Sequence, residues 1–113
     1  MNQELKNKLF ERFPKEWFPA DISIGDGWFQ ILYDLLAQWE LFVKNFGEPK
    51  FKILQIKQKF GGLRIYTNHG AEEIIRLTTN MAEKKSSITC EVCGSPGIFR
   101  EDGWLSVKCE QHK

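Results

Sequence analysis

The sequence predicts a single α+β domain in which helices pack on a small antiparallel sheet, the β-hairpin over residues 51–67, with a small cysteine-containing module at the C-terminal end. Two patterns support this prediction: a helical apolar period over residues 28–46, and a change to strand-like alternation around Gly61 and Gly62. The 113 residues suffice for one compact domain and are too few for two of ordinary size. A hydrophobic content of 42% excludes wholesale disorder.

The first apolar residues of the chain repeat with a helical period. Leu5, Leu9, Phe10 and Phe13 fall on one stripe, and Pro14 ends the predicted helix. The segment 15–27 is rich in Pro and aromatic residues and is too irregular for one regular element. Charged residues interrupt the apolar pattern of the N-terminus, which argues against a signal peptide. No apolar run approaches the roughly 18 residues of a membrane span, so we expect a cytoplasmic protein without membrane contact.

The strongest helical pattern follows Asp26. Its apolar residues recur at gaps of three and four: Trp28, Ile31, Leu32, Leu35, Leu36, Trp39, Phe42, Val43 and Phe46. Asp26 is the expected N-cap, and Gly47, with Pro49 close behind, is the expected C-terminal stop. A stripe of this kind is far more often core than a cofactor site, so this helix is the predicted centre of packing.

A β-hairpin is predicted around Gly61 and Gly62, which suit the positive φ angles of a two-residue turn. Pairing 60 with 63, 58 with 65 and 56 with 67 separates an apolar face from a polar one. The predicted core face holds Leu54, Ile56, Phe60, Leu63 and Ile65. The predicted outward face holds Gln55, Lys57, Lys59, Arg64, Tyr66 and Asn68.

A third helix is predicted from Ala71 to about Lys85. Its apolar side is expected to hold Ala71, Ile74, Ile75, Thr78, Met81 and Ala82. Acidic residues at its start and lysines at its end suit the helix dipole. Ser86 and Ser87 then form a short hinge, which divides the chain into an α+β body, residues 1–87, and a C-terminal module, residues 88–113, packed on it as one unit.

The C-terminal module carries a metal-binding pattern. Cys90 and Cys93 are separated by two residues, fifteen residues follow, and Cys109 and His112 are again separated by two. This is the spacing of a Cys₃His zinc ribbon, with a hairpin over residues 97–107 that brings the second ligand pair to the first. Four protein ligands leave no open position, so we predict one structural Zn²⁺ ion. Three unligated cysteines or a redox C-x-x-C are the weaker alternatives.

Several motifs together resemble a family of small uncharacterised proteins of bacteriophages and bacterial mobile elements. They are G-W-F-Q-I-L-Y-D-L at 27–35, I-K-Q-K-F-G-G-L-R-I-Y at 56–66, and T-C-E-V-C-G-S-P-G…D-G-W…C-E-Q-H at 89–112. The resemblance covers nearly the whole chain from Gly27 onward, although some members are expected to have Cys where His112 stands. It implies that hairpin and zinc ribbon form one recurring unit. It also implies a phage accessory role, in a bacterial host cell, directed at host or defence machinery.

Catalytic groups are scarce once the metal ligands are set aside. His69 is the one remaining histidine, and a histidine in a loop is most often solvated or a capping residue. Asp21 and Asp26 are weak candidates for a cation site. No phosphate-binding glycine loop or nucleophile elbow is present, so no catalytic residue is assigned and no small-molecule substrate is evident.

Positive charge is concentrated in the hairpin. The chain has 16 basic and 15 acidic residues, yet Lys50, Lys52, Lys57, Lys59 and Arg64 occur between Glu48 and Glu72 without any acidic residue. With Tyr66, the last three basic residues form a candidate partner-binding face: Lys57, Lys59, Arg64 and Tyr66. A charged face that only prevents edge pairing is the plain alternative. Among binding functions we favour a protein partner, with nucleic acid second.

The sequence therefore predicts a non-enzymatic, zinc-stabilised binding protein, a phage-type accessory factor that engages a host or defence complex, with inhibition of that complex as one mode of action. A small nucleic-acid-binding zinc-ribbon protein is the alternative, and a hydrolase or nuclease is a distant one.

Overall fold

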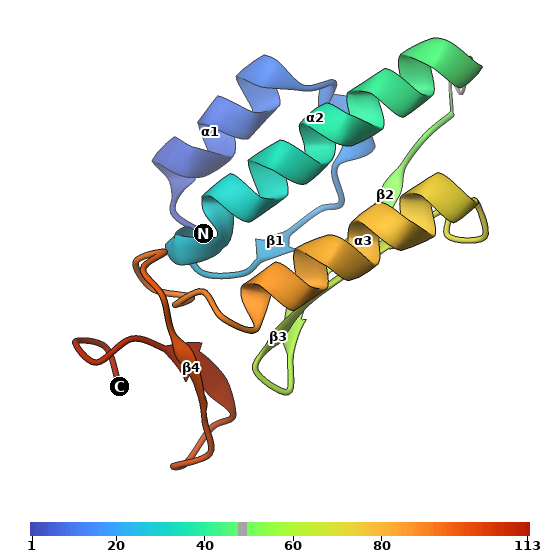
Figure 1. The fold of residues 1–113 in the computed structure, drawn as a ribbon. Coiled ribbons are helices and arrows are strands. Elements are labelled where there is room, and N and C mark those ends of the chain that lie inside the picture. Colours follow the sequence, from blue (N-terminus) through green and yellow to red (C-terminus); the bar gives the residue numbers. More distant parts are fainter. Residues whose placement is uncertain (48–49) are drawn as a thin grey trace.

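The computed structural model describes residues 1–47 and 50–113 and has the predicted α+β architecture (Figure 1). The expected stop at Pro49 lies outside these residues. The described residues form helices α1 (Gln3–Arg12), α2 (Phe29–Phe46) and α3 (Glu73–Ser86), two 3₁₀ turns, η1 (Lys15–Trp17) and η2 (Asp26–Trp28), and two small sheets. In this part of the chain no helix combines the length and apolar character that a membrane crossing needs.

The main sheet has the order β1-β2-β3, with β1 (Ile22–Ser23), β2 (Ile53–Lys59) and β3 (Gly62–Thr67). β2 and β3 are antiparallel, as predicted. β1 pairs in parallel with β2, with Ile22 opposite Ile56. β1 lies in the segment 15–27, which we expected to be irregular. A strand of two residues is too short to show alternation, so the sequence does not reveal it. Both Ile22 and Ile56 are buried. β1 therefore adds a third strand to the sheet and an apolar side chain to the core.

The predicted hairpin register is wrong by two residues. The turn is centred on Phe60 and Gly61, both with positive φ, at 53° and 84°, so Lys59 pairs with Gly62 and Gln58 with Leu63. A Cβ on Gly61 would lie 3.0 Å from the ring of Phe99 and 3.0 Å from the backbone nitrogen of Ser106. This close approach to the C-terminal module requires glycine at the second turn position, which shifts the turn and leaves Phe60 68% exposed instead of in the core.

A two-residue shift leaves the faces of the strands unchanged near the turn. Ile56, Leu63 and Ile65 are buried, as predicted. An irregularity between Ile53 and Gln55 changes the alternation at the start of β2. Consequently Ile53 lies in the core, and Leu54, predicted to be there, is 56% exposed.

Helix α2 is the central packing helix. Its buried residues contact α1, the sheet and α3 in one cluster: Leu32, Leu35, Leu36, Trp39 and Phe42. Gly47 ends the helix in the left-handed conformation, as predicted. The expected N-cap at Asp26 is wrong, because its carboxylate accepts hydrogen bonds from the backbone and side chain of Asn2, at 2.7 and 2.9 Å. Phe46, at the last position of the predicted stripe, is 69% exposed.

Helix α3 packs along β3, the edge of the main sheet (Figure 1). Ser86 is completely buried. Its hydroxyl accepts a hydrogen bond from the backbone N–H of Leu63 at 3.1 Å and donates to the carbonyl of Glu83 at 2.6 Å. The packed face is Ile75, Ala82 and Ser86, whereas Ile74 and Met81 are exposed. The predicted face was therefore right for Ile75 and Ala82 and wrong for Ile74 and Met81. The buried side is turned toward Ser86, because α3 also supplies a hydrogen-bond acceptor to the edge strand β3.

The C-terminal module is a short hairpin of β4 (Ile98–Arg100) and β5 (Ser106–Lys108). The ring of Phe99 joins this module to the body, because it lies against the β2–β3 turn at Gly61. A hydrogen bond from the side chain of Gln58 to the carbonyl of Leu105 at 3.1 Å is a second contact with the body. Trp104, in contrast, is 93% exposed. Trp104 lies in the turn between the two strands and lines a hollow with Lys59 and Phe60 of the body, but little of its ring is covered.

Candidate metal centre

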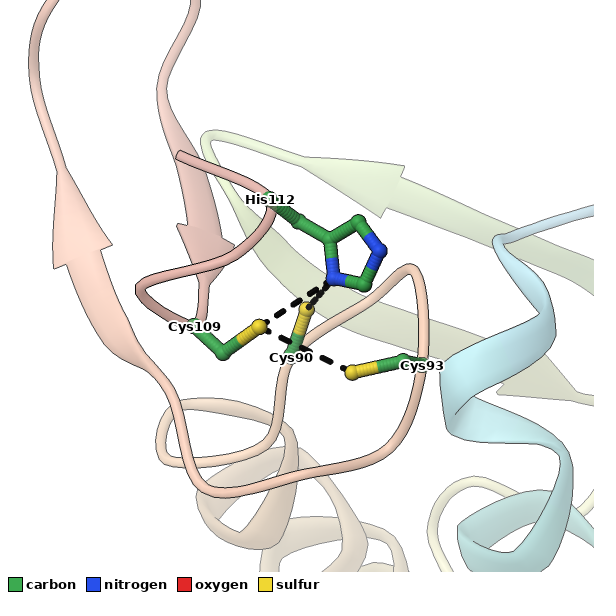
Figure 2. Close-up of side chains that lie close together, drawn as sticks. All are labelled: Cys90, Cys93, Cys109 and His112. Atoms are coloured by element: carbon green, nitrogen blue, oxygen red, sulfur yellow. Dashed lines mark hydrogen bonds between the residues drawn. The ribbon is translucent and has the colours of Figure 1, made fainter.

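The two predicted ligand pairs lie on two turns that face each other (Figure 2). The first turn holds Cys90 and Cys93 and is closed by a hydrogen bond from the N–H of Gly94 to the carbonyl of Cys90 at 2.9 Å. The second follows β5, and the N–H of His112 donates to the carbonyl of Cys109 at 3.2 Å. The hairpin of β4 and β5 spans the residues between the two pairs and brings the turns together.

The four ligand atoms form a compact cluster. All lie within 4.8 Å of one another. The sulfurs of Cys93 and Cys109 are 3.7 Å apart, and Nδ1 of His112 lies 3.8 Å from the sulfur of Cys90 and 3.1 Å from that of Cys109. Three sulfurs and one imidazole nitrogen directed at a common point can hold a metal ion.

The surrounding backbone favours a thiolate at Cys90. Burial raises the pKa of this thiol, but backbone N–H groups of Cys93, Cys109 and Val92 outweigh burial and lower the pKa to about 6. The pKa of Cys109 is raised, first by burial and also by the neighbouring sulfurs of Cys93 and Cys90. The thiolate form of Cys90 is thus favoured, and a cation at the cluster centre would relieve the repulsion that opposes ionisation of Cys109.

The first ligand turn packs on η2, directly before the start of α2. The N–H of Gly27 donates to the carbonyl of Glu91 at 2.7 Å, and the indole of Trp28, which is fully buried, donates to the carbonyl of Thr89 at 2.9 Å. The N–H of Gly25 donates to the carboxylate of Glu91 at 3.0 Å. These contacts attach the metal cluster rigidly to the main core.

Gly27 is required by this packing. A Cβ at this position would lie 2.1 Å from the carbonyl oxygen of Cys90 and 2.6 Å from the backbone nitrogen of Gly94. Both are backbone atoms, which cannot rotate away. Sequence reasoning missed this role. The available signal was the glycine directly before a tryptophan in a segment with no regular pattern.

The predicted partner-binding residues lie on one face of the β2–β3 hairpin, because opposite residues and residues two apart along a strand share a face. Lys57 and Arg64 are directly opposite each other across the strands. Lys59 and Tyr66 are exposed. Arg64 lies beside α3, where it lines a hollow together with Glu83. Burial in this hollow raises the pKa of Glu83, against the opposing effects of the Ile65 N–H and the Arg64 charge.

The remaining candidates are not brought to a common site. His69 lies against the ring of Phe51, with ring centroids 5.7 Å apart, and its Nδ1 is 2.7 Å from Oδ1 of Asn68. Asp21 accepts a hydrogen bond from Ser23 at 2.7 Å and lies 3.7 Å from Lys6. Asp26 holds the N-terminus through Asn2, as described above. These contacts support local structure.

Comparison with known proteins gives no match to a family model, a curated protein or a solved structure. The resemblance to phage proteins accordingly stays a prediction, and the function has to be argued from the geometry of this chain.

Proposed function

We propose that this protein is a zinc-stabilised binding module, which acts by presenting a surface to a macromolecular partner and has no catalytic site. One observation carries the proposal. Trp104 is 93% exposed at the tip of a hairpin whose base is the Cys₃His cluster. Tryptophan is enriched among the residues that contribute most to binding a partner, and an almost fully exposed indole has most of its surface available for such a contact.

Zinc fits the cluster best. With Zn–S bonds of about 2.3 Å and a Zn–N bond of about 2.0 Å, a tetrahedral site has S···S separations of about 3.8 Å and S···N separations of about 3.5 Å. The observed S···S separation of Cys93 and Cys109 is 3.7 Å, the two S···N separations are 3.8 and 3.1 Å, and all four atoms lie within 4.8 Å of one another, so small movements would complete the tetrahedron. Thiolate-rich sets also select zinc over harder cations. Four protein ligands close the shell, so the ion would supply structural stability and no reactive position.

The ion would fix the tip of the hairpin relative to the body. Cys90 and Cys93 are packed on η2 through Gly27 and Trp28, whereas Cys109 and His112 come directly after β5. A bond network through one ion therefore connects the core to the strand that follows Trp104. From the resemblance to phage proteins we further propose that the partner belongs to a bacterial host or to its defence machinery.

Affinity capture tests this proposal. Tagged, zinc-loaded protein and its Trp104→Ala and Phe46→Ala variants are incubated with bacterial lysate, with and without nuclease. Phe46 is the matched control because it is also an exposed ring, at the far end of α2 (Figure 1). The proposal expects a stoichiometric partner that is lost with Trp104→Ala and kept with Phe46→Ala. Equal recovery by all three proteins would contradict it, as would hydrolytic turnover by the purified protein, with or without added divalent metal.

A further inference from the structure

Three surface hollows lie next to one another where β3, α3 and the C-terminal hairpin meet. The first, of about 380 Å³, lies between β3 and α3 and shares Arg64 with the second. The second, of about 510 Å³, reaches the β2–β3 turn and shares Phe60 with the third. The third, of about 530 Å³, ends at Trp104. Neighbouring hollows share a wall residue and so lie side by side, and we call the row of three hollows the aromatic groove.

The exposed apolar side chains along the aromatic groove are rings. Tyr66 is 45% exposed, Phe60 68%, Phe99 46% and Trp104 93%. They come from three different segments: Tyr66 from β3, Phe60 from the turn, and the other two from the C-terminal hairpin. Several aromatic rings along one groove suit a ligand that consists of successive planar groups, because each ring can stack on one of them.

Basic side chains stand among these rings. They are Lys59, Arg64, Arg76 and Lys84. Among the described residues that line the groove, Glu83 is the one acid. The groove is therefore positively charged although the whole chain carries a formal charge of only +1, and this favours an anionic ligand.

Phe60 is held in place at a conformational cost. Its φ of 53° is in the left-handed region, where a bulky residue is a genuine outlier and Asn or Gly would be favoured. Its 68% exposure shows that core packing does not explain the ring. A strained, exposed side chain points to function, because the turn would be more favourable without it.

We infer that the aromatic groove binds single-stranded nucleic acid, with the rings of Phe60 and Trp104 stacking on bases and Lys59, Arg64 and Lys84 contacting phosphates. This inference rests on the proposed function and specifies the class of partner. Aromatic platforms interleaved with positive charge along a channel are the arrangement that accommodates successive unpaired bases without sequence preference. The bases and phosphates concerned are common to single-stranded DNA and RNA.

Two alternatives fit the groove less well. A duplex keeps its base faces stacked inside, so it offers nothing to four exposed rings. A protein partner would be expected to meet aliphatic side chains as well, yet the exposed aliphatic residues of α3 lie on a different side of that helix: Ile74, Leu77 and Met81. The structure thus favours nucleic acid, whereas the hairpin sequence alone favoured protein.

The metal site and the groove are parts of one assembly. Phe99 and Trp104 line the groove from the hairpin that the Cys₃His cluster anchors, and Gly61 brings the β2–β3 turn into contact with that hairpin. Removing the ion should free one wall of the groove. Binding should then weaken together with the loss of metal.

Fluorescence anisotropy with the full-length, zinc-loaded protein tests the inference. The probes are labelled oligothymidylate and oligouridylate of about 15 nucleotides and a duplex of the same length. Wild-type protein should bind both single strands more tightly than the duplex. The log–log dependence of affinity on salt should have a slope of about −2 to −3, as expected for three or four neutralised phosphates.

The decisive variants are Phe60→Gly and Trp104→Ala. Each should weaken single-strand binding roughly ten-fold or more through loss of a stacking platform. Phe60→Gly should at the same time melt no lower than wild type, because glycine suits the turn. This opposite movement of binding and stability separates a binding role from a structural one.

Charge variants complete the test. Lys59→Glu should weaken binding and make the salt slope shallower by about 0.7 or more. Lys8→Glu on α1 is the matched charge control and Phe46→Ala the matched ring control, since both residues are exposed outside the groove. Both controls should stay within about two-fold of wild type.

The outcomes separate this inference from the proposed function. No single-strand binding at low salt, tighter duplex binding, or binding unchanged in both decisive variants would overturn the inference. If the lysate then yields a nuclease-resistant protein that requires Trp104, the proposed binding function stands and the partner is a protein. If Trp104→Ala also changes nothing in the lysate, both proposals fail.

Discussion

Gly27→Ala is the sharpest test of how the ligand turn packs on η2. The added Cβ would lie 2.1 Å from the carbonyl oxygen of Cys90 and 2.7 Å from the carbonyl carbon of Glu91. Contacts of Cβ below 3.0 Å essentially do not occur, so the ligand turn and η2 must separate by about 1 Å, which exceeds the tolerance of a good hydrogen bond.

The expected cost follows from the hydrogen bonds that this separation breaks. The N–H of Gly27 loses the carbonyl of Glu91, at present 2.7 Å away, and the buried indole of Trp28 loses the carbonyl of Thr89, at 2.9 Å. One ordinary hydrogen bond contributes about 1 kcal/mol, and a buried donor left unsatisfied costs about 1–3 kcal/mol. We therefore expect a loss of about 2–4 kcal/mol in the free energy of unfolding.

The assay compares zinc-loaded wild type, Gly27→Ala and Gly70→Ala by denaturant unfolding and by the rate of zinc transfer to a colorimetric chelator. Gly70 is the matched control, because a Cβ there would meet only the carbonyl oxygen of Thr67 at an ordinary 3.8 Å. Gly27→Ala should unfold at lower denaturant and release zinc faster. If both variants match wild type in stability and in release rate, the close contact of Gly27 with the ligand turn is not what holds the metal site to the body.

Three further predictions concern the metal and the sheet edge. Cys93→Ser, or a chelator, should remove stoichiometric zinc, measured by elemental analysis, and lower the melting temperature substantially; a sharp melting transition untouched by chelator would contradict the structural role of the ion. Zinc affinity, measured by chelator competition, should increase with pH because binding displaces thiol protons. It should fall more steeply below about pH 6, where Cys90 is protonated as well; an affinity independent of pH would contradict a thiolate site. Ser86→Ala should cost about 1–3 kcal/mol in the free energy of unfolding, because the N–H of Leu63 loses its acceptor at 3.1 Å. Ser87 is exposed, so Ser87→Ala should lower the free energy of unfolding by less than about 0.5 kcal/mol. Equal losses in the two variants would show that the Ser86 hydroxyl is not a stabilising acceptor for the N–H of Leu63.

Local patterns in the sequence were sufficient for the fold class, for the central helix and its end at Gly47, and for the set of four metal ligands. These features depend on neighbours a few residues apart: an apolar stripe repeats within one helix, and each ligand pair is separated by two residues on one turn. The burial of Ile56, Leu63 and Ile65 followed in the same way, because alternation along a strand selects a face whatever the register.

Tertiary contacts decided the rest. The turn lies at Phe60 and Gly61 and not at the predicted Gly61 and Gly62, because Gly61 packs against the C-terminal hairpin. No local pattern in the sequence encodes the position of that hairpin. Gly27 acquired its role from a ligand turn more than sixty residues further along the chain. Whether an aromatic residue joins the core or remains exposed depends on which distant segments cover it. For this reason the exposure of Trp104, and the groove that it shares with Phe60, became visible only in the folded chain.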